Sequence, residues 1–169
     1  PRCPHFGQCG GCLFQDVAYP RQLEMKRDFL IRELAAGGLE GAGTGDLVGQ
    51  IVPSPDIYGY RNKMEYGFGL SGGTLRLGLR ERSGKGPYRR TISLGTCPIF
   101  GETFEKIAPH VLGFAARTGL DIYDQYSNKG CLRNLVVREG KNTGQIMAVL
   151  VTAEENILGL EETAEALTA

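Results

Sequence analysis

Cysteines near the start of this 169-residue chain are the residues best suited to chemistry. Cys3, Cys9 and Cys12 follow a C-x5-C-x2-C spacing, and Cys97 comes much later in the chain, directly before Pro98. Four thiolates that converge on one point suit an iron–sulfur cluster or a zinc ion. Because zinc sites more often use two short cysteine pairs, the three-plus-one spacing favours a cluster, and zinc is the alternative.

The residues around these cysteines are expected to form a loop over 1–15 that encloses an inorganic core. The two glycines before Cys12 would let the backbone turn tightly, since glycine reaches conformations closed to other residues. His5 is expected at the surface or facing a nucleic acid, because four thiolates already supply a full set of ligands. Phe6 and Phe14 are expected to shield the core from water.

The chain's net charge of zero hides a segregation of charge along the sequence. Residues 57–96 contain eight basic and two acidic residues, whereas residues 154–169 contain five glutamates and no basic residue. Tyrosine and phenylalanine residues are interleaved with the bases of the first segment. Such a block is typical of a site for a polyanion with surfaces for base stacking. A solvated sheet face is the alternative interpretation.

A helix is expected over 16–36, with its leucines on one face from residue 19 onward. Asp16 can cap its start, Pro20 suits its first turn, and Gly37 can end it. The glycines that follow imitate a nucleotide-binding loop, but such loops follow a strand and open a helix. We therefore interpret 37–47 as a flexible glycine-rich linker.

From residue 48 onward the hydrophobic period switches to two, which predicts antiparallel strands. Leu70 would lie on the apolar face of the central hairpin, with Arg76 and Arg80 on the opposite, basic face. Pro109 is expected to kink or break the later helix. The fold class is therefore α+β, an antiparallel sheet with helices packed on one side, and 48–169 form one domain. Strands are expected at 48–53, 61–70, 74–81, 88–94, 132–138 and 145–152, and helices at 99–118 and from about 156.

No apolar run is long enough to cross a bilayer, and no signal-peptide pattern opens the chain. We therefore expect a cytoplasmic protein that has no membrane partner. The sequence begins without methionine and ends within a half-built segment, so we also expect it to be part of a longer protein.

Several motifs, in order, resemble the iron–sulfur RNA uracil-5-methyltransferases, which act mainly on 23S ribosomal RNA and in some relatives on tRNA. The resemblance spans most of the chain. It rests on Cys3-Pro-His-Phe-Gly-Gln-Cys9-Gly-Gly-Cys12, on Tyr60-Arg61-Asn62-Lys63, on Cys97-Pro98 and on Leu132-Arg133-Asn134-Leu135-Val136-Val137-Arg138.

The resemblance implies that Cys3, Cys9, Cys12 and Cys97 hold a [4Fe–4S] cluster and that the chain is a central, RNA-binding domain. S-adenosylmethionine, the nucleophilic cysteine and the general base would belong to a C-terminal methyltransferase domain that is absent here. No residue of this chain is therefore assigned to catalysis, and the chain alone is expected to be inactive. Cys131 matches no nucleophile motif and is expected to be a small buried thiol.

The partner that the resemblance implies is RNA, with 23S ribosomal RNA favoured over tRNA, and the protein is expected to be a monomer. Phosphate neutralisation is expected from the basic block, Arg82, Lys85 and Arg90 included. The candidate RNA contacts are Arg61, Lys63, Arg76, Arg80, Arg89, Arg133 and Arg138.

Two other functional classes remain as alternatives. One is a stand-alone RNA-binding module with a structural zinc ion and no enzyme activity. The other is a redox protein that uses the cluster for electron transfer. The second would need an acidic or apolar partner surface near the cluster, but the sequence places basic residues near Cys97 instead.

Overall fold

The computed structural model of the protein describes residues 1–39, 43–82, 90–155 and 157–168. The chain divides into two compact units. The first comprises Phe14–Ile57 together with Pro1, and the second comprises Arg2–Leu13 and Tyr58–Ala169. In the described ranges, none of the helices combines the length and apolar character needed to span a bilayer.

The first unit is built on helix α1 (Tyr19–Ala36), whose predicted bounds from residue 19 are confirmed. Pro20 lies in its first turn and Gly37 caps its C-terminus. The expected cap at Asp16 is wrong, because Ala18 occupies the N-cap position and no side chain caps the helix there. Instead, the Gln22 side-chain amide donates to two carbonyls of the preceding loop, those of Phe14 and Val17, each at 2.9 Å.

Two further predictions for the first unit need correction. The linker expected over 37–47 contains a short helix, α2 (Thr44–Leu47), and residues 40–42 lie outside the described ranges. Residues 48–53 form no strand. The Arg27 guanidinium binds the carbonyl of Val48 at 3.1 Å, and Pro53 has no N–H to donate to a ladder. A strand there would also need a partner, and the sheet belongs to the second unit.

The second unit contains a five-stranded antiparallel sheet in the order β3-β2-β1-β4-β5, which confirms the predicted α+β class. Both predicted hairpins are present, and Gly72 and Gly73 supply the positive φ angles that the first turn requires. The expected strand at 88–94 is shorter, and residues 83–89 lie outside the described ranges. The strands are β1 (Lys63–Ser71), β2 (Thr74–Arg80), β3 (Thr91–Ser93), β4 (Leu132–Glu139) and β5 (Ile146–Thr152).

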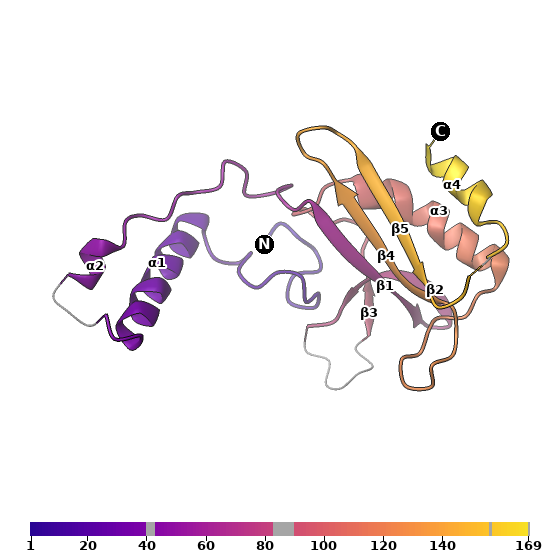
Figure 1. Ribbon diagram of the computed structural model, residues 1–169, viewed down its shortest axis with the longest axis horizontal. Helices are drawn as coiled ribbons and strands as arrows, with labels where there is room; N and C mark the ends of the chain where they lie inside the picture. Colours follow the sequence, from indigo (N-terminus) through magenta and orange to yellow (C-terminus); the bar gives the residue numbers. More distant parts are fainter. Residues whose placement is uncertain (40–42, 83–89, 156, 169) are drawn as a thin grey trace. The chain divides into compact units, whose positions relative to one another are not determined.

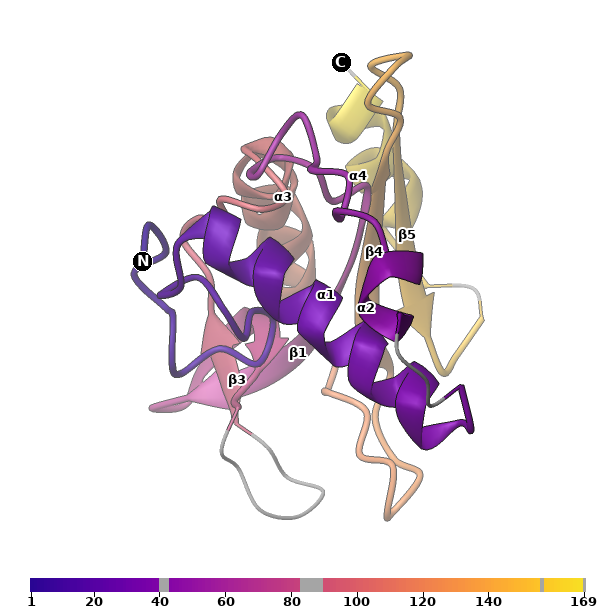
Figure 2. The same cartoon turned by 90° about the vertical axis from the view of Figure 1, so that its left-hand side faces the viewer.

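Helix α3 (Thr103–Thr118) covers one face of this sheet, and α4 (Leu160–Thr168) packs against α3 (Figures 1 and 2). Helix α3 begins four residues later than predicted, because the residues after Cys97 form a turn first. It continues through Pro109 without a break, contrary to one expectation. Helix α4 likewise begins after the predicted position, and Asn156 lies outside the described ranges.

The two faces of the sheet differ as the alternation predicts. Met64, Tyr66 and Phe68 of β1 point into the core, which α3 completes with a row of apolar side chains. Leu70 does not join them and is 61% exposed, because it lies beside the hairpin turn at the end of β1. We use the name polar face for the opposite side, which carries Lys63, Glu65, Gly67 and Gly69 of β1 with their strand partners Arg76, Gly78, Asn134, Val136 and Arg138, and also Arg80.

Candidate cysteine site and nucleic-acid interface

The N-terminal cysteine loop is joined to the end of β2. Cys9 forms an antiparallel bridge with Glu81, the residue after that strand. The Gly10 amide donates to the Arg80 carbonyl at 3.0 Å, and the Arg82 amide donates to the Gln8 carbonyl at 2.7 Å. The loop is thus held by main-chain hydrogen bonds on both sides of Cys9.

The glycine pair between Cys9 and Cys12 is needed for close packing. A Cβ atom on Gly10 would lie 3.1 Å from the Arg80 carbonyl oxygen, and one on Gly11 would lie 3.1 Å from Leu79 Cδ1. Neither glycine has the left-handed φ that the sequence-based interpretation assumed. Their role is therefore to let the loop approach β2, and not to reach a special turn conformation.

Cys97 lies in a turn that is fixed to the chain before β1. Its carbonyl accepts the amides of Phe100 and Gly101, both at 2.9 Å. The next two carbonyls accept from the entry to β1: Gly59 donates to Pro98 and Arg61 donates to Ile99, again at 2.9 Å. This pairing fixes the Cys97 turn beside the main chain at Arg61.

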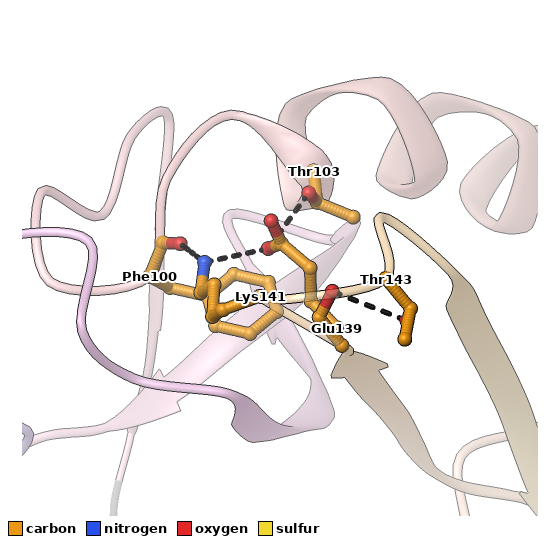
Figure 3. Close-up of polar contacts among 6 residues, drawn as sticks. Phe100, Thr103, Glu139, Lys141 and Thr143 are labelled. Atoms are coloured by element: carbon orange, nitrogen blue, oxygen red, sulfur yellow. Dashed lines mark hydrogen bonds and ion pairs between the residues drawn. The ribbon is translucent and has the colours of Figure 1, made fainter.

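The same turn is tied to the β4–β5 hairpin by a lysine (Figure 3). The Lys141 ammonium donates to the Phe100 carbonyl at 2.9 Å and pairs with the Glu139 carboxylate at 2.8 Å. The Thr103 hydroxyl donates to the same carboxylate at 3.1 Å. The Cys97 turn, the start of α3 and the hairpin therefore share one polar network.

The four predicted ligand cysteines differ in burial. Cys9 and Cys97 are buried, and Cys3 and Cys12 are half-buried. Burial raises the pKa of both Cys9 and Cys97, and the thiols of Cys12 and Cys3 raise each of these pKa values further. Cys9 and Cys97 belong to one core cluster and Cys12 packs against it, so the N-terminal loop and the Cys97 turn lie against the same core.

Backbone amides point at two of these sulfurs. The Gly11 amide donates to Cys9 Sγ at 3.4 Å and opposes the rise in the pKa of Cys9. The amides of Phe100 and Ile99 do the same for the pKa of Cys97. Hydrogen bonds of this kind favour the thiolate form, which is the form that binds iron or zinc.

A buried hydroxyl lies near the same site. Tyr66 is fully buried and stacks on Phe104 at 3.8 Å between ring centroids. Its hydroxyl has no hydrogen-bond partner within the described residues. Burial raises the pKa of Tyr66 strongly, the Cys97 thiolate adds to the rise, and Arg61 opposes it. An orphaned hydroxyl costs about 1–3 kcal/mol, so the site has a donor for which a sulfur acceptor would be favourable.

Cys9, Cys12 and Cys97 pack in or against one core cluster, but their side chains are not arranged as the ligands of one metal ion. Across 1–39, 43–82, 90–155 and 157–168, no group of three or more histidine, cysteine or acidic side chains is arranged so that it could hold a metal ion. The soft thiols, the amides directed at sulfur and the Tyr66 hydroxyl nevertheless fit a thiolate-bound cluster in chemical type. Cys131 is buried just before β4, and its amide donates to Asp121.

The polar face carries a first hollow beside the cysteine loop, with a volume of about 480 Å³. Gly10 and Gly11 form one wall of this hollow, and residues of β1, β2 and β4 form its floor. Three of the predicted RNA contacts line it together: Arg61, Lys63 and Arg80. Glu65 and Glu81 line the hollow as well, and Glu65 lies 4.0 Å from the Lys63 ammonium, so the bases exceed the acids by one.

A second hollow, of about 500 Å³, lies further along β1. Its walls come from the strands and from the loop at 122–126. Arg80 lines this hollow too, and Arg90 and Arg133 join it. The Arg133 guanidinium lies 4.5 Å from the centroid of the Tyr123 ring, in a cation–π contact.

The remaining predicted contacts are more scattered. Arg76 and Arg138 share the polar face by register but line neither hollow. Arg89 and Lys85 lie outside the described residues. Asn134 and Tyr123 also line the hollows, and no sequence pattern singled them out. The signal that was overlooked is the alternation of Gly67 and Gly69 with the core residues of β1, which marks a face where another group can approach the backbone.

The chain is similar in sequence and in structure to known RNA methyltransferases. No family model matches the chain. It is 37% identical over 154 residues to an RNA methyltransferase of Caldanaerobacter subterraneus described as uncharacterized, covering 90% of this chain and 33% of that protein. It is 35% identical over 157 residues to the tRNA (uracil(54)-C(5))-methyltransferase of Pyrococcus abyssi, covering 93% of this chain and 34% of that protein.

The structural comparison agrees with these sequence matches. A crystal structure of the Pyrococcus abyssi tRNA (uracil-54, C5)-methyltransferase, in complex with S-adenosyl-L-homocysteine, superposes with a TM-score of 0.69 at 28% identity. The match covers 95% of this chain and 35% of that one. The chain spans about a third of the length of the curated relatives it matches. Over nearly its whole length, this chain is therefore similar to about a third of these RNA methyltransferases.

Proposed function

We propose that this chain is the cluster-bearing, RNA-binding part of an S-adenosylmethionine-dependent RNA uracil-C5 methyltransferase. The observation that carries the proposal is the position of the cysteine loop, which is hydrogen-bonded to β2 beside a hollow lined by Arg61, Lys63 and Arg80. Its relatives are named as RNA methyltransferases, some of them specific for uracil 54 of tRNA. A cytoplasmic monomer suits this role.

In this proposal Cys3, Cys9, Cys12 and Cys97 hold a [4Fe–4S] cluster. Four soft thiols, two sets of amides directed at sulfur and the buried Tyr66 hydroxyl support the assignment. When bound, the cluster supplies a covalent cross-link between the N-terminal loop and the Cys97 turn. Closing a long loop removes more entropy from the unfolded chain than closing a short one, so this cross-link would stabilise the fold.

The metal assignment is tested by anaerobic purification followed by analysis of iron, sulfide and zinc. We expect brown protein with iron and sulfide in equal amounts. Cys97→Ser should lose the cluster, whereas the matched variant Cys131→Ser should keep it, because Cys131 lies just before β4 and matches no ligand motif. Protein that binds one zinc ion and no iron would instead favour the stand-alone RNA-binding module.

Methyl transfer in this proposal belongs to the part of the relatives that this chain does not span. We therefore expect no methylation of C5 when the chain alone is incubated with labelled S-adenosylmethionine and unmodified RNA. We expect it to bind RNA, and 23S ribosomal RNA and tRNA are the two substrates to compare. Incorporation of label by the purified chain would overturn the assignment of catalysis to another domain.

A further inference from the structure

Arg80 occupies an unusual position where the two hollows of the polar face meet. Both hollows are lined by Arg80 and Asn134. Along β1, residues 63–65 and Gly67 line the first hollow and 68–70 line the second, so the hollows follow one another along the strand. At about 3.4 Å per residue, the lined part of β1 is about 20–25 Å long, which is enough for several nucleotides of an extended strand.

The guanidinium of Arg80 lies flat over Gly67. A Cβ atom on Gly67 would be 3.5 Å from Nη2, 3.6 Å from Cζ and 3.6 Å from Nε of Arg80. Nearly equal distances to these atoms mean that the guanidinium faces the strand with its plane. Its Nη1 donates to the Thr91 hydroxyl at 3.2 Å, and Thr91 is itself buried. The side chain is thus spread over the sheet, yet Arg80 remains exposed to solvent.

The neighbouring glycines have a different reason to be glycine. A Cβ atom on Gly69 would collide with the Thr91 side chain, and one on Gly78 would collide with the Ile92 carbonyl. Internal packing therefore requires both of them. At Gly67 an added Cβ would make only ordinary contacts with Arg80, so packing alone does not require glycine there. The feature that distinguishes Gly67 is the Arg80 guanidinium, which lies over it.

Polar groups suited to reading a base edge lie beside this guanidinium. Asn134 is the β4 partner of Gly67, and its side-chain amide donates to the Glu65 carboxylate at 2.7 Å. Together they present donors and acceptors within one small area. Arg133, held against the Tyr123 ring, supplies a second planar group in the adjoining hollow.

We propose that the junction of the two hollows binds an unpaired nucleotide of single-stranded RNA, with its base stacked on the outward face of the Arg80 guanidinium. Unstacked bases in RNA are recognised by stacking on aromatic rings or on guanidinium planes, together with hydrogen bonds to their edges. Asn134 and Glu65 contact the base edge. The flanking phosphates lie toward Lys63 on one side and Arg90 on the other. This inference rests on the proposed RNA-binding function and specifies the RNA feature that it recognises.

The test compares two conservative variants on the same strand. Arg80→Lys keeps the charge but removes the plane, and Arg76→Lys is its matched control, because Arg76 lies on the polar face outside both hollows. The probe is a short single-stranded oligouridylate that carries one 2-aminopurine, titrated with the cluster-loaded protein. Arg80→Lys should weaken binding about tenfold, since one stacked base contributes about 1–3 kcal/mol. The salt dependence should not change, and Arg76→Lys should bind like wild type.

The fluorescence of 2-aminopurine separates stacking from a general loss of structure. Wild-type protein should quench it on binding, and Arg80→Lys should not, at protein concentrations that saturate both. Equal quenching by the two proteins would overturn the stacking. Binding to folded tRNA without binding to the oligonucleotide would overturn this inference and leave the proposed function intact. Binding to neither RNA would overturn both.

Discussion

At the residue scale, the Tyr66 hydroxyl tests whether the cysteine site contains a sulfur atom that accepts a hydrogen bond from this side chain. It is buried without a partner in the described part of the chain, close enough to Cys97 for the thiolate to raise its pKa. Tyr66→Phe should leave the free energy of unfolding of metal-free protein unchanged or raise it by about 1 kcal/mol, because an unsatisfied polar group is removed. Denaturant titration measures this change.

In cluster-loaded protein the same variant tests a second property, the reduction potential of the cluster. If the hydroxyl donates to a cluster or cysteine sulfur, its removal should lower the reduction potential, because hydrogen bonds to sulfur stabilise the more negative, reduced state. An unchanged potential, measured by spectroelectrochemistry, would show that Tyr66 contributes packing alone.

The buried thiols also predict how the stability of metal-free protein depends on pH. Burial raises the pKa of Cys9 and Cys97 above the ordinary value of 9.0, so the folded state favours the protonated thiols. The stabilisation is complete below that value and is lost as the pH rises through the folded-state pKa. Unfolding free energies measured in urea should therefore fall above about pH 9, and less steeply in Cys9→Ala and Cys97→Ala. Identical slopes in all three proteins would contradict this.

Residues that act through their own chemistry were predictable from sequence, and residues that act through their neighbours were not. Cys9 and Cys97 stand out by type and spacing, and both lie in one core cluster, while their role as ligands stays a prediction. Gly67 and Asn134 become meaningful only when the register pairs them across β1 and β4 and Arg80 lies over the glycine. That register depends on contacts between segments far apart in sequence, which a local pattern does not contain.

At the element scale, alternation predicted the two hairpins because β1, β2 and β4 each contribute alternate side chains to the core that α3 completes, although β5 has no buried residue. The predicted strand at 48–53 is absent. This stretch pairs with no strand, and the Val48 carbonyl accepts a hydrogen bond from Arg27. The alternation also placed Leu70 in the core, although α3 does not cover that end of β1. Periodicity thus indicates which side chains share a face, but the extent of the covering helix decides which of them are buried.

The close approach of β3 to β2 gives a prediction for a single element. A Cβ atom on Gly78 would collide with the Ile92 backbone, so Gly78→Ala should destabilise the protein by more than about 2 kcal/mol and detach β3. Gly113→Ala in α3 is the matched control. Its nearest neighbour would be the flexible Arg117 side chain at 3.4 Å, so it should be neutral or stabilise by about 0.5–1 kcal/mol. The midpoints of thermal unfolding of the two variants measure this difference, and equal midpoints would refute the packing role of Gly78.

At the scale of the whole molecule, zero net charge coexists with a concentrated basic surface. Among the described basic residues of 57–96, the two hollows are lined by Arg61, Lys63, Arg80 and Arg90. The glutamates of 154–169 lie in and before α4, which packs against α3 on the other side of the second unit (Figure 1). The charge segregation visible in the sequence therefore becomes a segregation between faces, which is the arrangement that orients a polyanion.

The first hollow predicts how RNA affinity responds to salt. Replacing Arg61 and Lys63 together by alanine should weaken RNA binding and flatten the dependence of log affinity on log salt by about 1.4–1.8, since each phosphate contact contributes about 0.7–0.9. Lys106→Ala on α3 is the control and should change neither quantity, because Lys106 is exposed on the helix that covers the opposite face of the sheet. Filter binding of tRNA over a range of salt concentrations measures both effects.

The double variant must also be shown to retain its site. Arg61 lowers the pKa of Cys9, so its loss could weaken the cysteine site as well as the phosphate contact. Visible absorption and the thermal midpoint should therefore match wild type before binding is compared. If affinity and salt slope stay at wild-type values while the midpoint falls, the bases of the first hollow hold the fold together, and the polyanion must bind at another part of the surface.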